Sequence, residues 1–117
     1  MEKRLIVLYG NSVIVGTVGA SLRRSHQYEV VPMLPSQQNE LETAAPDVVV
    51  FDLEAARPEA AFSMLENRPG LKLIGISPDS NLVRIWSGKQ LRELSTQGLL
   101  KIVSEQMEES SAPDTQG

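Results

Sequence analysis

The chain has 117 residues, of which 41% are hydrophobic and 22% are charged, and its formal net charge is −4. This length suits a single domain, and the mixture is that of an ordinary globular protein, which excludes wholesale disorder. No apolar run reaches the roughly 18 residues of a membrane helix, and the run after the charged start is too short for a secretory signal. The chain has no cysteine, which excludes disulfides and thiolate metal sites. We therefore expect a cytoplasmic protein that binds no membrane.

The negative charge is concentrated near the end of the chain. Four of the 15 acidic residues and no Lys or Arg lie in residues 104–117, which leaves residues 1–103 with eleven acids and eleven bases. Phosphate binding needs a cluster of Lys and Arg, and this neutral body has none and only 4% aromatic residues, so we expect no nucleic-acid partner. We expect one domain over residues 1–107 and a disordered acidic tail over residues 108–117.

Four apolar segments predict strands. Residues 5–9, 48–51 and 71–76 are short and rich in β-branched side chains, and the first two do not alternate with polar residues, which is typical of strands buried on both faces. Residues 28–34 predict a fourth strand. Its Pro32 cannot donate a ladder hydrogen bond, so this strand is expected at a sheet edge.

Helices are predicted between these strands. Ser12 is a good N-cap, and apolar residues follow it at spacings of three and four, namely Val15, Val18 and Leu22. Further helices are expected over residues 36–45, after Pro58, and from Ser95 or Thr96 to Met107. Gly16 and Gly19 do not form a dinucleotide-binding fingerprint, and we expect them to let the first helix approach the sheet. Alternating strands and helices predict a parallel sheet with helices on both faces.

The segment after residue 76 breaks this alternation. Residues 77–81 are too few for a parallel crossover, which takes a dozen or more residues. Two apolar segments follow, and the Gly-containing turn between them predicts a β-hairpin over residues 82–94. A competing interpretation starts one long helix at Gly88, although Gly98 weakens it.

Residues 46–53, Pro-Asp-Val-Val-Val-Phe-Asp-Leu, resemble the third strand of response-regulator receiver domains. In that family the aspartate that ends this strand accepts a phosphoryl group, so the resemblance implies Asp52 as phosphoacceptor and Ser77 as the Ser/Thr that ends strand four. It covers residues 3–77. It implies a flavodoxin-like three-layer α/β sandwich around a central parallel sheet, here without the fourth helix and with a C-terminal hairpin plus helix.

Several receiver positions are altered. Gly10 and Asn11 stand where receivers carry the acid pair that holds Mg²⁺, an ion that prefers carboxylate oxygens. Receivers place a lysine at the end of strand five, whereas Lys89 lies past the turn, and Pro58 comes six residues after Asp52 instead of four. These departures favour a degenerate receiver, or pseudo-receiver. We expect a non-catalytic signalling or regulatory module with no metal or other cofactor, which binds a protein partner or a second copy of itself.

Candidate site residues follow from the rule that open α/β sheets bind ligands at the carboxyl ends of their strands. These candidates are Gly10, Asn11, Ser12, Asp52, Glu54, Ser77 and Asp79. Asp52 is also interpreted as a polar cap of its own loop, and Ser77 as a turn residue. Two other functions stay open, a receiver phosphorylated on Asp52 and a small-ligand-binding α/β protein. Trp86 is interpreted either as the edge of the core or as the aromatic anchor of an interaction surface on the hairpin.

Overall fold

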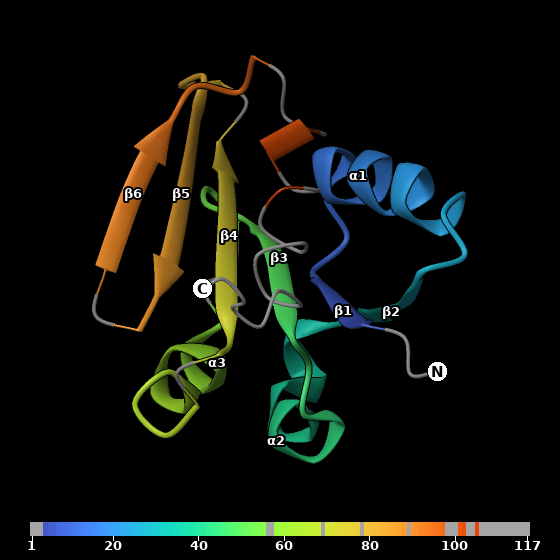
Figure 1. Ribbon diagram of the computed structural model, residues 1–117, viewed down its shortest axis with the longest axis vertical. Helices are drawn as coiled ribbons and strands as arrows, with labels where there is room; N and C mark the ends of the chain where they lie inside the picture. The colour runs from blue at the N-terminus through green and yellow to red at the C-terminus, as the bar shows by residue number, and fades with distance from the viewer. Residues whose placement is uncertain are drawn as a thin grey trace, which may run out of the picture.

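The chain alternates strands and helices up to residue 77 and then continues with two strands in succession (Figure 1). The computed structural model describes residues 4–55, 58–68, 70–77, 79–88, 90–97, 101–102 and 105. The elements are β1 (Arg4–Tyr9), α1 (Val13–Arg23), β2 (Tyr28–Met33), the 3₁₀ helix η1 (Pro35–Glu40), α2 (Leu41–Ala44), β3 (Val48–Asp52), α3 (Glu59–Met64), β4 (Lys72–Ser77), β5 (Leu82–Ser87) and β6 (Gln90–Leu94).

The six strands of the described residues belong to one sheet, in the order β2-β1-β3-β4-β5-β6. Strands β1 to β4 are parallel, whereas β5 runs antiparallel to β4 and β6 runs antiparallel to β5. The predicted flavodoxin-like, receiver-like sandwich around a parallel sheet is therefore wrong, because this sheet is mixed and the described helices are few. The physical reason is the link over residues 78–81, since a parallel crossover needs about a dozen residues or more.

Strands β5 and β6 form a hairpin in which Ser87 pairs with Gln90. Gly88 has φ +62° and occupies the first central position of the two-residue turn, where both favoured hairpin turns require a positive φ. Residues 90–94 are strand, so the competing helix from Gly88 is not formed. The hairpin places β6 at one edge of the sheet, and β2 with its Pro32 forms the other edge.

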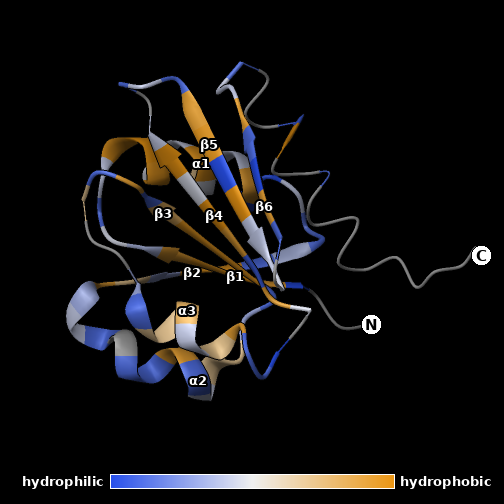
Figure 2. Cartoon of the chain, turned by 90° about the vertical axis from the view of Figure 1, so that its left-hand side faces the viewer, coloured by the Kyte–Doolittle hydropathy of each residue, from blue (hydrophilic) through white to orange (hydrophobic). Residues whose placement is uncertain are grey.

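The sheet has a separate apolar core on each face, and Figure 2 shows α1 on one side of it and α2 and α3 on the other. Helix α1 buries Val15, Val18 and Leu22, while α2 and α3 bury Leu41, Ala61 and Met64. Residues 48–51 of β3 are buried throughout, as their unbroken apolar run predicts. This layering leaves the carboxyl ends of the parallel strands at one end of the sheet.

Helix α1 lies close to β1 at one glycine. A Cβ atom on Gly19 would overlap Cδ1 of Leu8, whereas a Cβ atom on Gly16 would meet nothing within 4 Å. Gly19 therefore permits the close approach that the sequence predicts for both glycines, and Gly16 does not contribute to it.

The helix expected over residues 36–45 is divided into η1 and α2. Of the last predicted helix, Lys101, Ile102 and Glu105 are helical, and Ile102 packs against the core on the α1 side. The other parts of that helix over residues 98–107, and the predicted tail over residues 108–117, lie outside the described residues. Within the described ranges, no helix is both long enough and apolar enough to cross a membrane.

Candidate functional site

The predicted site lies where the carboxyl ends of β1, β3 and β4 meet. The chain leaves β1 through α1 on one face of the sheet and leaves β3 through α3 on the other. Adjacent strands whose connections leave on opposite faces make a topological switch point, the usual position of a ligand crevice in an α/β sheet. The switch point here lies between β1 and β3.

The loop after β1 is held by its backbone. Gly10 has φ +92° and donates its N–H to the carbonyl of Met33 at 2.8 Å. Asn11 is exposed. The hydroxyl of Ser12 accepts a hydrogen bond from the N–H of Val15 at 3.3 Å, which caps α1. Among the three candidates in this loop, Gly10 and Ser12 thus have structural roles.

The loop after β3 closes on the side chain of Asp52. Oδ1 of Asp52 accepts a hydrogen bond from the N–H of Glu54 at 2.8 Å, and its carbonyl accepts one from Ala55 at 3.1 Å. This is an Asx-type turn, in which a carboxylate bonds to its own backbone two residues on. Leu53 then donates to the carbonyl of Ile76 at 2.9 Å and joins this turn to β4. Asp52 therefore acts as a cap of its own loop.

Two further candidates are joined by a hydrogen bond. Ser77 is only 3% exposed, and its hydroxyl donates to the carboxylate of Glu54. The structure thus brings Asp52, Glu54 and Ser77 together, while Asp79 is exposed beyond the end of β4. The sequence names Glu54 and Ser77 but does not predict their bond, because that bond depends on how β3 and β4 are paired.

Sequence reasoning missed Tyr9, the last residue of β1. Tyr9 is 2% exposed and belongs to the core on the α2 and α3 side. Burial raises the pKa of its phenol, and the nearby carboxylate of Glu59 at the start of α3 raises it further. The signal that could have found Tyr9 is its place as the one hydroxyl-bearing residue of the apolar run over residues 5–9.

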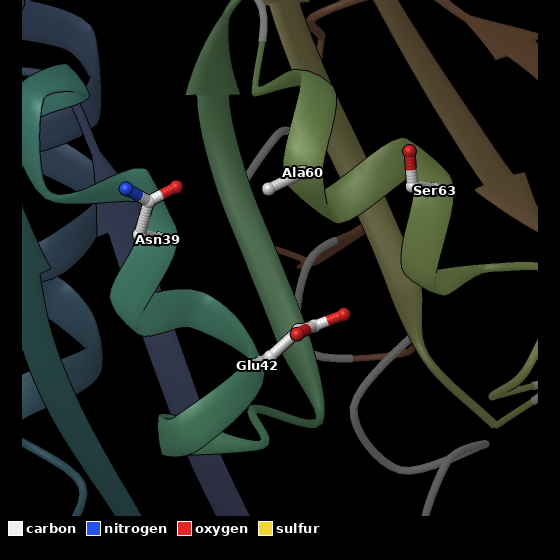
Figure 3. A pocket seen from close by; sticks show the side chains of 4 residues that line it. All are labelled: Asn39, Glu42, Ala60 and Ser63. Carbon is white, nitrogen blue, oxygen red and sulfur yellow. The ribbon is translucent and has the colours of Figure 1, made fainter.

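A separate cavity of about 270 Å³ lies between η1 and α2 on one side and α3 on the other. Figure 3 shows its lining residues, which are Asn39, Glu42, Ala60 and Ser63. An amide, a carboxylate and a hydroxyl therefore border the same space. None of these residues was predicted, because the cavity exists only where two short helices, distant in sequence, lie side by side.

Trp86 lies in an aromatic cluster. Its ring stacks on Phe51 with a centroid separation of 5.8 Å and meets Phe62 edge-on at 4.9 Å. Of the two interpretations of Trp86, these contacts correspond to the core edge, and its role in an interaction surface stays a prediction. Within the described part of the chain, no three His, Cys, Asp or Glu side chains are grouped so that they could hold a metal ion.

Comparison with known proteins assigns no family. No family model and no curated protein matches the chain. The chain is similar to the crystal structure of UDP-D-quinovosamine 4-dehydrogenase from Vibrio fischeri, with a TM-score of 0.43 and 14% sequence identity over 85% of this chain and 99% of that one. Similarity at this level supports no assignment of activity.

Proposed function

We propose that this chain is a cytoplasmic, non-catalytic signalling or regulatory module, which acts by binding protein and not by phosphoryl transfer. The observation that carries the proposal is the engagement of Asp52. Its carboxylate accepts a hydrogen bond from the N–H of Glu54, and it therefore serves the loop that follows β3. In a receiver the corresponding carboxylate has to attack a phosphoryl group.

The neighbouring residues support the same proposal. Phosphoryl transfer depends almost entirely on positioning and on positive charge that stabilises the transferred group. Gly10 and Asn11 carry no carboxylate with which to hold a metal ion. The hydroxyl of Ser77 is bonded to Glu54, and the carboxylate of Glu54 adds negative charge beside the place that an anionic phosphoryl group would occupy.

Protein binding is supported by the hairpin. Strand β6 is the outermost strand beyond β5, and residues 90–93 are exposed. An exposed strand at a sheet edge offers backbone donors and acceptors, which is a recurring way for one chain to bind another. The hairpin therefore gives the chain a surface for a partner strand.

The absence of phosphoryl chemistry is tested by incubating the whole chain with acetyl phosphate and Mg²⁺ and measuring its intact mass. We expect no phosphoryl adduct, and no change in Trp86 fluorescence with beryllofluoride and Mg²⁺. The matched control is Asp52→Asn, which keeps the size of the side chain and removes the nucleophile. An adduct that forms on the unmodified chain and is lost in Asp52→Asn would overturn the proposal.

The proposed protein binding is tested with a photo-reactive residue in place of Leu91 on β6. Cross-linking to protein is expected from this position and not from Val13, which is more exposed but lies on α1. Equal cross-linking from the two positions would contradict a binding surface on β6.

The cavity between α2 and α3 favours a second candidate, a small-ligand-binding protein. Asn39, Glu42 and Ser63 could orient a ligand with several hydroxyl or amino groups by hydrogen bonds. A thermal-shift screen of nucleotides and flavins tests this. A ligand that raises the melting temperature of the chain, but not that of Glu42→Gln or Ser63→Ala, would favour this candidate over the first.

A further inference from the structure

Among the described residues, strand β6 pairs with a strand on one side only, namely β5. It pairs with β5 from Ser87↔Gln90 to Val83↔Leu94, and it ends the strand order of the sheet. Its side chains are exposed from Gln90 to Glu93, and Leu94 is half-buried. Because β6 ends the order of the described strands, a further strand can pair with its outer edge.

The register of the hairpin decides which backbone groups face outward. Residues that flank a two-residue turn form a hydrogen-bonded pair, and such pairs alternate along an antiparallel ladder with pairs that exchange no bonds. Ser87 and Gln90 flank the turn, so Gln90, Arg92 and Leu94 direct their backbone groups toward β5. Leu91 and Glu93 therefore direct their N–H and C=O groups to the free edge.

Leu91, whose backbone groups face the free edge, also ends an apolar strip. It lies directly across from Trp86 in the ladder, and Trp86 contacts Phe51 of β3 and Phe62 of α3. The strip thus runs from the core to the sheet edge and stops at Leu91, which is 50% exposed. A second apolar side chain placed opposite Leu91 would extend this strip and cover it.

The charge on Arg92 disfavours one way of pairing two copies through β6. Glu93 forms an ion pair with Arg84 of β5, with 2.9 Å between Oε2 and Nε, so its charge is compensated within the sheet. Two copies related by a two-fold axis pair their β6 strands antiparallel. The axis then lies midway between one residue of β6 and the same residue of the other copy, and these two residues face each other. An axis at Arg92 would set Arg92 against the partner's Arg92, whereas an axis at Glu93 would set together two carboxylates that are each paired with Arg84 of their own copy. Like charges directly opposite each other are destabilising.

An axis at Leu91 avoids the clash of the two arginines and brings together the exposed leucine side chains of the two copies. It sets Leu91 against the partner's Leu91 and Gln90 against the partner's Arg92. It also makes Leu91 and its equivalent a hydrogen-bonded pair, since the backbone groups of Leu91 face outward.

We propose that two copies of this chain associate through β6, antiparallel, about a two-fold axis at Leu91, which joins their sheets into one. This deepens the proposed function, on which it rests, by naming the partner as a second copy.

The absence of native cysteine gives a direct test of this geometry. Cα atoms of a hydrogen-bonded antiparallel pair lie about 5.5 Å apart, within the range that a disulfide spans. Mild oxidation of Leu91→Cys should therefore give a covalent dimer on a non-reducing gel. Val13→Cys is the control, because Val13 is 85% exposed and has the more accessible side chain, and it should give little dimer. Equal yields from the two variants would overturn the proposal.

A second test uses the fact that residue 91 of one copy faces residue 91 of the other copy in this dimer. Leu91→Lys and Leu91→Glu each place like charges across the axis, and each should raise the dimer dissociation constant about tenfold or more in sedimentation experiments. An equal mixture of the two variants should form a heterodimer again, because lysine then faces glutamate. Circular dichroism checks that both variants are folded.

The outcomes separate this proposal from the broader one. A mixture that stays monomeric, or an unmodified chain that sediments as a monomer at high concentration, overturns the pairing of two copies. Cross-linking from Leu91 to a different protein would also overturn it but would leave the binding function standing. An Asp52-dependent phosphoryl adduct would overturn the proposed function and leave the dimer standing.

Discussion

The two glycines of α1 provide a matched pair of substitutions within one helix. Gly16→Ala adds a methyl group where nothing lies within 4 Å, while Gly19→Ala drives the same group into Leu8, which is 3% exposed. Both substitutions gain helix propensity, about 1 kcal/mol for Ala over Gly. Overpacking a core costs about 1–3 kcal/mol. We expect Gly16→Ala to raise the free energy of unfolding by about 1 kcal/mol and Gly19→Ala to lower it or leave it unchanged.

The difference between these two variants isolates the packing cost, because the propensity gain is common to both. That difference should be about 1–3 kcal/mol, measured by urea unfolding with the fluorescence of Trp86, the single tryptophan. In a Leu8→Val background, which lacks the overlapped Cδ1 atom, the two variants should differ less. If Gly19→Ala stabilises the chain as much as Gly16→Ala, the close approach of α1 to β1 is refuted.

Three other substitutions test the site and the core. Asp52→Ala should lower the free energy of unfolding by about 0.5–1.5 kcal/mol, through loss of the bond from Glu54; a clear gain in a urea melt would indicate a crowded carboxylate instead. Burial and Glu59 raise the pKa of Tyr9 above 10.0, so the folded state holds this proton more tightly than the unfolded state does. The free energy of unfolding should therefore fall as the pH rises past about 10. Urea midpoints should show a smaller fall for Tyr9→Phe than for the unmodified chain, and an equal fall in both would contradict the raised pKa of Tyr9. Trp86→Ala should lower the free energy of unfolding by about 2–3 kcal/mol, as followed by circular dichroism. This is less than for a fully buried tryptophan because Trp86 is only partly buried, and a smaller loss would indicate a role outside the core.

Those parts of the fold that depend on neighbouring residues could be predicted from the sequence. Pro32 places its strand at an edge, the cap at Ser12 begins α1, and the short turn at Gly88 joins two strands. The short link after residue 77 also excludes a parallel crossover, and β5 is antiparallel to β4. The receiver-like fold class is wrong because the short apolar motif over residues 46–53 carries no information on the direction of the strands that follow it.

The same distinction between contacts near in sequence and contacts far apart in sequence applies to the candidate site. The turn at Asp52 involves residues two positions apart, and the sequence alone indicates a loop cap as one of two interpretations. The bond between Glu54 and Ser77 joins residues 23 positions apart, and it depends on the pairing of β3 with β4. Tyr9 was missed for a different reason, because an apolar run conceals a hydroxyl group that tertiary packing buries.

The two edges of the sheet differ in what they allow an assembly to become. Strand β2, at the edge opposite β6, carries Pro32 in its interior, and a proline has no N–H with which to continue a ladder. A molecule with two receptive edges could add copies at both ends and grow into a fibre. With Pro32 interrupting one edge, growth through the other edge closes after two copies, so the same proline that suits β2 to a sheet edge also limits polymerisation.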